Sequence, residues 1–262
     1  MSEQVIDMGK YQRQTIIPQI GEEGQQRLKN SRVTVIGAGG LGCPVLTYLV
    51  EAGVGNIRII DSDSVSLTNL NRQFLHREAD TGRKKTESAE EKLRTMNSSV
   101  KINTVTGRLT EENAEELIVG STGSSCTMPD VVIDCVDNIK TRLVVSEWCM
   151  QREIPLVEGG ISGFYGFVTV ISRETACLEC LGYHSGMDGK TVPALGTTAG
   201  VIGSLQAAEC LKILLGAGNI LYGRMLQYDG LESCFDEIRI QYREDCRLHL
   251  RAAKGNKQKE KE

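Results

Sequence analysis

Four glycines stand together where an apolar, β-branched segment gives way to a helix-like one. The run Gly37-Ala38-Gly39-Gly40-Leu41-Gly42 follows RVTVI, which has the composition of a buried strand. Glycines permit a tight turn and let phosphates approach the backbone, while a helix N-terminus supplies free N–H groups and a partial positive charge. Asp61 ends the next expected strand, where a carboxylate could hold ribose hydroxyls. The pattern predicts a nucleotide site; the alternative is a tight strand–helix crossing that binds no ligand.

A cluster of amide and cationic side chains follows in the long polar segment 62–82 and at the expected helix start beyond it. Its members are Asn69, Arg72, Gln73, Arg83, Lys84 and Lys85. A dinucleotide needs no such cluster, whereas a triphosphate does, because Arg and Lys neutralise the β- and γ-phosphates as pyrophosphate leaves. Asp137, just beyond another expected strand, could hold magnesium. The sequence therefore favours ATP over NAD, and a solvated helix face is the alternative interpretation of the cluster.

Two ligand pairs near the C-terminus have the spacing of a zinc site. The pairs are Cys177-Leu-Glu-Cys180 and Cys246-Arg-Leu-His249. Each pair can supply two ligands from a tight turn, and the two pairs together can hold one zinc ion in a tetrahedron. Four protein ligands leave no open position, so the expected site is structural and would hold the irregular segment 172–196 against the C-terminal region. His184 is a rival fourth ligand, and reduced thiols without metal are the alternative.

Composition and charge exclude several classes of function. The net charge of −4 gives no signal for polyanion binding, so nucleic acid is not an expected partner. Residues 1–10 lack the apolar core of a signal peptide, and apolar stretches such as 131–136 are too short to cross a bilayer. The odd number of cysteines, nine, favours reduced thiols and a cytoplasmic protein.

The elements that must position these residues alternate between strand and helix up to residue 151. Strands are expected at 32–37, 56–61, 100–105 and 130–135, and helices at 21–31, 40–52, 83–96, 111–119 and 138–151. Beyond them we expect strands at 154–157 and 167–171, a helix at 199–215, and an antiparallel pair at 224–228 and 237–241. This order predicts an α/β, Rossmann-like mixed sheet, parallel in its N-terminal half and antiparallel in its C-terminal strands, flanked by helices.

One domain is expected over residues 1–251, followed by a disordered charged tail at 252–262. Within it, 1–30 is an N-terminal helical segment, 31–150 a nucleotide-binding half and 151–251 a second half with the zinc site. The segment 120–129 has the composition of a flexible surface loop. His76 is expected as a polar loop residue near the nucleotide. The cysteines outside the ligand pairs are expected to pack mostly as small hydrophobes; they are Cys43, Cys126, Cys135, Cys149, Cys210 and Cys234.

The chain closely resembles the MoeB/ThiF/HesA family, relatives of ubiquitin-activating enzymes. The resemblance runs from residue 11 to 249 and is carried by YQRQTIIPQIGEEGQQRLKNSRVTVIGAGGLGCP, DSDSVSLTNLNRQFLH, DTGRKK, DCVDN and GVIGSLQAAECLKIL. It implies ATP-dependent adenylation of the C-terminal Gly-Gly carboxylate of a small ubiquitin-fold sulfur-carrier protein, with release of pyrophosphate. The half 151–251 is then expected to bind the carrier. The family usually has cysteine where this chain has His249.

The resemblance also assigns roles to individual residues. The expected nucleotide contacts are Gly37, Gly39, Gly40, Gly42, Asp61, Asp63, Asn69, Arg72, Gln73, Lys85 and Asp137, with Asp61 on the ribose and Asp137 on magnesium. Arg13 matches an arginine that reaches into the neighbouring subunit's active site, so the resemblance implies a homodimer. The expected catalytic set is Arg13, Arg72, Lys85 and Asp137.

Two other functions are alternatives to adenylation, and the sequence also bears on how far the reaction proceeds. An NAD-dependent oxidoreductase would leave the basic cluster unexplained, and a non-catalytic binding module of the same fold should lack Arg72, Lys85 or Asp137, which are all present. Some family members carry a cysteine that captures the activated carrier; the matching position is Gly189, and no cysteine lies between Cys180 and Cys210. We therefore expect the reaction to stop at the acyl-adenylate, with sulfur from an external donor. Thiamin, molybdopterin, amino-acid and tRNA thiolation all remain as pathways.

Overall fold

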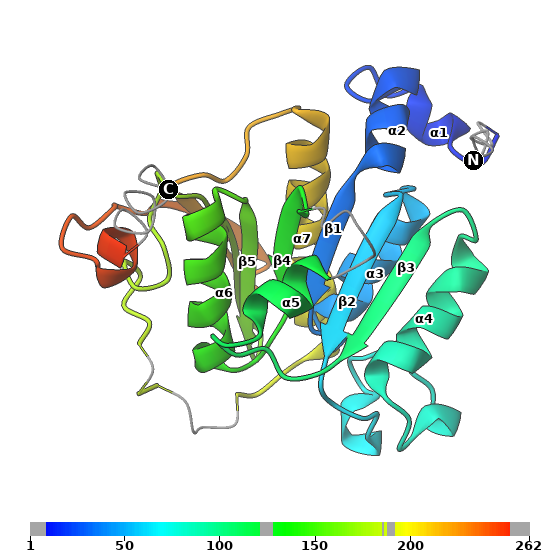
Figure 1. The fold of residues 1–262 in the computed structure, drawn as a ribbon, viewed down its shortest axis with the longest axis horizontal. Helices are drawn as coiled ribbons and strands as arrows, with labels where there is room; N and C mark the ends of the chain where they lie inside the picture. The colour runs from blue at the N-terminus through cyan, green and yellow to red at the C-terminus, as the bar shows by residue number, and fades with distance from the viewer. Residues whose placement is uncertain (1–8, 121–127, 185, 188–191, 252–262) are drawn as a thin grey trace.

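The described part of the chain forms an eight-stranded sheet, with the strands in the order β3-β2-β1-β4-β5-β6-β7-β8 (Figure 1). The computed structural model describes residues 9–120, 128–184, 186–187 and 192–251. The strands are β1 (Arg32–Ile36), β2 (Asn56–Asp61), β3 (Lys101–Thr106), β4 (Val131–Asp134), β5 (Leu156–Ser162), β6 (Tyr165–Ile171), β7 (Arg224–Asp229) and β8 (Cys234–Arg239). The pairs from β3 through β5 are parallel and those from β5 through β8 antiparallel, which confirms the predicted mixed sheet.

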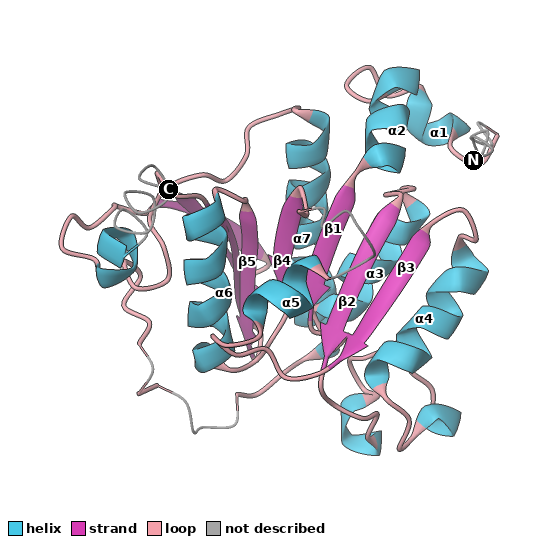
Figure 2. Ribbon diagram, in the orientation of Figure 1, coloured by secondary structure: helices cyan, strands magenta, loops and turns pink. Residues whose placement is uncertain are grey.

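Helices cover both faces of this sheet (Figure 2). They are α1 (Gln12–Thr15), α2 (Gly21–Asn30), α3 (Gly42–Glu51), α4 (Lys85–Met96), α5 (Ala114–Val119), α6 (Ile139–Arg152) and α7 (Gly196–Leu215), with short 3-10 turns η1 (Leu67–Asn69) and η2 (Glu78–Asp80). Successive strand side chains point to opposite faces. In β4, Val131 and Ile133 therefore join the core under α3 and α7, while Val132 joins the core under α5 and α6.

Helix α7 is the longest apolar element in the described part of the chain. By length and composition alone it could cross a membrane, so the expectation that every apolar stretch is too short was wrong for this helix. It packs against α3, β4, β5 and β6, and Ala199, Ile202, Ala207 and Cys210 are fully or almost fully buried. Its apolar composition is explained by this central position in the core.

The predicted elements are all present, with boundaries shifted where side chains or turns intervene. The expected helix 111–119 begins only at Ala114, because Asn113 Oδ1 accepts a hydrogen bond from the Thr110 N–H at 2.8 Å and holds the chain in a turn. The last strand was expected at 237–241 but lies at 234–239, since the tight turn after β7 pairs Asp229 with Cys234. Residues 121–127 of the expected loop and the tail 252–262 lie outside the described residues.

Candidate active site and metal centre

A cleft with a volume of about 1130 Å³ opens beside the carboxyl ends of β1, β2 and β4. The chain leaves β1 toward β2 and β3 and later returns to the other side of β1 as β4, so the cleft lies where the strand order reverses. Open α/β sheets bind ligands at such a point. Most of the expected site residues line this cleft: Gly37, Gly39, Gly40, Asp61, Asp63, Arg72, Gln73, Lys85 and Asp137.

The glycine-rich loop is as tight as its sequence predicts. Gly37 has a φ of +100°, and a Cβ there would lie 2.7 Å from the Cys135 carbonyl oxygen. A Cβ on Gly42, at the start of α3, would collide with the Gly37 carbonyl. Both positions therefore require glycine for steric reasons. Asp61 holds the loop from below, because its Oδ2 accepts a hydrogen bond from the Ala38 N–H at 2.8 Å.

Gln73 offers a buried acceptor beside the loop. It is 4% exposed, and a Cβ on Gly39 would lie 3.4 Å from its Nε2. Among the described residues its Oε1 has no hydrogen-bond partner. A buried acceptor left without a donor costs stability, so this atom fits a ligand that donates a hydrogen bond, such as a ribose hydroxyl. The wall of the cleft is thus suited to a nucleotide.

Lys85 is held at the cleft by an ion pair. Its side chain is almost fully buried, and its Nζ lies 2.9 Å from Oδ2 of the exposed Asp63. Burial alone would raise the pKa of Asp63, but the hydrogen bond and charge of Lys85 outweigh it and lower that pKa. Lys85 is also the first residue of α4, where the helix dipole disfavours a cation. Asp63 compensates for this placement and directs the ammonium group into the cleft.

Arg72 is oriented by its own loop. Its guanidinium donates to the Thr68 carbonyl at 3.2 Å, to Asn71 Oδ1 at 3.0 Å and to Asn69 Oδ1 at 3.4 Å. Asn69 thus contacts Arg72 and is not among the residues that line the cleft, and its expected contact with the nucleotide stays a prediction. The Asn69 side-chain oxygen accepts its hydrogen bond from Arg72.

A buried ionic group that the sequence analysis missed supports the loop carrying Asp137. Arg142 pairs with Glu158, donates to the Gly159 carbonyl at 2.8 Å and donates to the Val136 carbonyl at 2.6 Å. Asp134 Oδ1 accepts a hydrogen bond from the Val136 N–H at 2.9 Å. Burial raises the pKa of both Asp134 and Glu158. A charged residue inside an otherwise apolar strand was the available signal, since such groups are rarely buried without a partner.

The cleft continues beyond the nucleotide-like pocket across β5, β6 and β7. This arm is lined by residues that the sequence analysis did not single out, namely Tyr165, Phe167, Tyr183, Tyr228 and Asp229. Arg108, which follows β3, lines the nucleotide side of the cleft, where its charge acts on Asp63. The floor of the arm is crowded: a Cβ on Gly160 would lie 2.6 Å from Phe167 Cε1. The arm therefore has a narrow base and an aromatic wall.

Arg13 is not brought into this cleft. It lies exposed on α1 and is not among the residues that line the cleft. Helix α1 lies near the end of the sheet where β1 begins (Figure 1), whereas the cleft lies beside the carboxyl end of β1. Within one chain Arg13 cannot join Arg72, Lys85 and Asp137.

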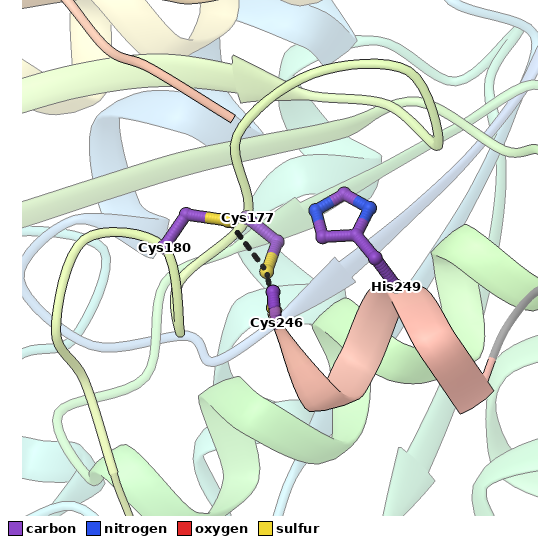
Figure 3. A group of neighbouring side chains, drawn as sticks. All are labelled: Cys177, Cys180, Cys246 and His249. Carbon is purple, nitrogen blue, oxygen red and sulfur yellow. Dashed lines mark hydrogen bonds between the residues drawn. The ribbon is translucent and has the colours of Figure 1, made fainter. Parts of the chain in front are cut away.

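The two ligand pairs meet in space. One ligand atom from each of Cys177, Cys180, Cys246 and His249 can be chosen so that all lie within 4.8 Å of one another. The Cys177 sulfur lies 3.8 Å from that of Cys180 and 3.4 Å from that of Cys246. Tetrahedral zinc with Zn–S bonds of about 2.3 Å separates its sulfurs by about 3.8 Å. The imidazole of His249 points toward the cysteines (Figure 3), and its buried Nε2 has no hydrogen-bond partner among the described residues.

The rival fourth ligand is elsewhere. His184 is exposed, and its Nδ1 accepts a hydrogen bond from the Gly186 N–H at 3.3 Å. It does not belong to the cluster of possible ligands found in the described residues. The donor set Cys₃His, with an orphaned imidazole nitrogen, fits zinc.

The remaining described cysteines divide by burial. Cys43, Cys135, Cys149 and Cys210 are buried, as expected for small hydrophobes, and burial raises the pKa of Cys43 to about 12. Cys234 is exposed at the start of β8 and is the exception among them. Cys126 and Gly189 lie outside the described residues.

Comparisons with known proteins agree with this geometry. A profile of the ThiF family matches residues 11–248. A sulfur carrier protein adenylyltransferase of Thermus thermophilus is 39% identical over 252 residues, which cover 92% of this chain and 90% of that protein. A SAMP-activating enzyme E1 of Haloferax volcanii is 37% identical, covering 94% of this chain and 90% of that protein. The adenylyltransferase and sulfurtransferase MOCS3 of Culex quinquefasciatus is 39% identical, but the chain spans only 55% of its length.

Solved structures with the same fold include E. coli MccB. Its crystal structure with MccA-N7isoASN has a TM-score of 0.79 at 20% identity, covering 92% of this chain and 74% of that one. The crystal structure of MccB with ATP has a TM-score of 0.74 at 21% identity, covering 86% and 68%. At these identities the likeness is one of fold.

Proposed function

The chain belongs to the ThiF family, and we propose that it uses ATP to adenylate the C-terminal carboxylate of a small ubiquitin-fold sulfur-carrier protein. The observation that carries this proposal is that Arg72, Lys85 and Asp137 line the same cleft as the glycine-rich loop. The carboxylate attacks the α-phosphorus, a new acyl–phosphate bond forms, and pyrophosphate leaves with the electron pair of the broken P–O bond. The names of the Thermus and Haloferax relatives describe activating enzymes of this kind.

The nucleotide half of the cleft supplies the groups for this chemistry. Backbone N–H groups around Gly39 and Gly40 receive phosphate, and Gln73 with the free lone pairs of Asp61 receives the ribose. Lys85 and Arg72 neutralise the charge that develops as pyrophosphate leaves. Asp137 is exposed at the wall, so its carboxylate can hold hydrated Mg²⁺, which would share the phosphate charge.

The second arm of the cleft suits the tail of the carrier. A chain ending in Gly-Gly has no side chains at its last two positions, and the crowded floor at Gly160 and Phe167 favours such a tail. Tyr165 and Tyr228 stand on the wall where bulkier residues of the tail would pass. The carrier's terminal carboxylate would then reach the nucleotide pocket from the β5–β7 side.

The position of Arg13 supports the proposal that the protein is a homodimer. Because Arg13 lies outside the cleft of its own chain, we assign it to the cleft of a second copy. Two observations support an interface at this end of the sheet: Ile16 and Tyr48 are 66% and 53% exposed, and a groove of about 390 Å³ lies beside α3 and α7. Mixing inactive Arg13→Ala and Lys85→Ala chains should restore activity, because each mixed dimer then contains one complete site. Failure to restore any activity would place Arg13 outside catalysis or in its own chain.

The metal centre is proposed as a structural zinc site. It would join the segment after β6 to the helical turn at 247–251, which lies beside α6. Four protein ligands leave no coordination position for substrate, so the ion would stabilise the fold and take no part in adenylation. Sulfur would come from an external donor, because Cys210 is fully buried in α7. We expect a cytoplasmic enzyme with neither nucleic acid nor membrane as a partner.

ATP–pyrophosphate exchange tests the activity directly. Labelled pyrophosphate should enter ATP only when a carrier ending in Gly-Gly is present. The matched control is the same carrier lacking its last glycine, which should give no exchange. Exchange at full rate without any carrier would refute the proposal, and quenched NADH fluorescence on binding without exchange would favour an oxidoreductase instead. Genes near this one, or a pull-down of small Gly-Gly proteins, would identify the carrier and its pathway.

A further inference from the structure

His76, expected as a polar loop residue near the nucleotide, is buried behind the glycine-rich loop. It is 4% exposed, and both ring nitrogens are engaged. Nε2 lies 2.9 Å from the Ala38 carbonyl oxygen, and Nδ1 lies 2.8 Å from Ser88 Oγ. A carbonyl oxygen only accepts, so Nε2 must carry the proton and donate to Ala38. In the neutral ring Nδ1 is then the acceptor, and the Ser88 hydroxyl donates to it.

The chain of donors extends to a buried ion pair. Ser88 Oγ accepts from Lys92 Nζ at 3.1 Å, and Lys92 is paired with Asp80. Asp80 is 3% exposed; burial alone would raise its pKa, but Lys92 and further hydrogen bonds outweigh it and lower that pKa. Each donor thus points one way, from Lys92 through Ser88 and His76 to Ala38. A buried network in which every member has a partner holds its geometry rigidly.

This series of hydrogen bonds ends at the Ala38–Gly39 peptide of the candidate nucleotide loop. A trans peptide is planar, with its C=O and N–H pointing in opposite directions. By holding the Ala38 carbonyl, His76 therefore directs the Gly39 N–H away from itself, and Gly39 lines the cleft. On its other side Ala38 donates its own N–H to Asp61 at 2.8 Å. Both polar groups of Ala38 are clamped, so the loop is ordered before any ligand arrives.

Charged groups around His76 favour its neutral form. Burial is the largest cause that lowers the pKa of His76, and the ammonium groups of Lys85 and Lys92 on α4 lower it further. The Ala38 carbonyl and the carboxylate of Asp61, at the end of β2, act in the opposite direction. A protonated ring would carry a hydrogen on Nδ1 as well. Ser88 would then accept from both the imidazolium and Lys92, and its hydroxyl hydrogen would turn from Nδ1 toward Asp80, so the order of donors would change.

We propose that His76 is a positioning residue, which fixes the Ala38–Gly39 peptide through the Lys92–Ser88–His76 chain and makes nucleotide affinity depend on the neutral ring. The inference rests on the proposed function in one respect, that the glycine-rich loop binds a nucleotide. His76 itself touches no phosphate in this arrangement. Its effect should appear in ATP affinity more than in the rate of the bound complex.

Two substitutions separate donation from titration. His76→Leu removes the imidazole donor and leaves the Ala38 carbonyl only the weak, 3.8 Å contact with the Cys43 thiol. Binding of the fluorescent analogue mant-ATP should therefore weaken about tenfold. His76→Gln keeps an N–H donor but does not titrate, so its affinity at about pH 8 should stay within about threefold of the wild type. The matched control is His184→Gln, which changes an exposed histidine outside the chain of hydrogen bonds. Ser88→Ala is a second route to the same loss if His76→Leu does not fold.

The pH profile gives the decisive comparison. As pH falls from about 8 to about 5.5, wild-type affinity should fall more steeply than that of His76→Gln, and the control should follow the wild type. In exchange assays His76→Leu should raise the KM for ATP while leaving kcat within about threefold. Equal affinities of the wild type, His76→Leu and Ser88→Ala at about pH 8, or identical pH profiles of the wild type and His76→Gln, would overturn the inference. Absence of mant-ATP binding by the wild type would instead refute the proposed function.

Discussion

Lys85 is the residue whose replacement should separate activity from stability most cleanly. Methionine keeps most of the buried side-chain volume but removes the charge, so Lys85→Met tests the ammonium group alone. In the folded protein the loss of the ion pair with the exposed Asp63 costs about 0.2–1 kcal/mol. Removing the positive charge from the N-terminus of α4 ends an unfavourable interaction with the helix dipole and stabilises the folded protein by about 0.3–1 kcal/mol. The two terms nearly cancel, so the free energy of unfolding should change by less than about 1 kcal/mol.

Activity should respond very differently. If Lys85 stabilises the phosphate charge that develops in the transition state, its loss should slow exchange by about 10²–10³-fold. The assay is carrier-dependent ATP–pyrophosphate exchange together with urea unfolding of the same preparation. Lys84→Met is the matched control, because Lys84 is the adjacent, exposed lysine. A loss of less than tenfold, or an equal loss in both variants, would refute the role assigned to Lys85.

Three further predictions concern the metal centre, the buried ionic group and the thiols. Metal analysis should find about one zinc per chain, with a lower melting temperature after chelation or in Cys177→Ser, and His249→Ala but not His184→Ala should lose the metal. Arg142→Leu leaves buried carboxyl groups without their cation, so urea unfolding should show destabilisation of about 3–5 kcal/mol, whereas a shift below about 1 kcal/mol would contradict the network. Enzyme, carrier and ATP without reductant should give no covalent enzyme–carrier band on a gel, and a band that disappears in Cys210→Ala would show that the enzyme goes beyond the adenylate.

The predictable parts of the site are those whose partners are close in sequence. Gly42 fits this rule, because its Cβ would meet the Gly37 carbonyl of the same turn. The turn also gives Gly37 a positive φ, although the atom that its Cβ would meet is the distant Cys135 carbonyl, which spacing does not show. The pair Cys177 and Cys180 is likewise set by a short turn. Asp61 lines the cleft, and its role on the ribose stays a prediction. Its contact with the Ala38 N–H was not predicted, because that contact joins two strand ends.

The harder parts depend on elements that meet only after folding. His76 and Ser88 are separated by a loop and a helix start, and nothing in their spacing shows that both support the Ala38 carbonyl. Arg142 lies on the buried side of α6, and its partner Glu158 comes from β5. A sequence pattern marks such residues only as unusual, because burial and pairing are properties of the packed core.

The amino-acid sequence by itself determined the alternation of strands and helices, the glycine turn and the two ligand pairs, since local periodicity and short-range sterics decide each of them. The tertiary structure alone decided which histidine completes the cysteine cluster, that Asn69 serves Arg72, and that Arg13 lies away from its own cleft. These outcomes depend on how elements that are distant in sequence pack against each other. That placement follows from the packing of two cores on one sheet, which no single segment of the chain contains.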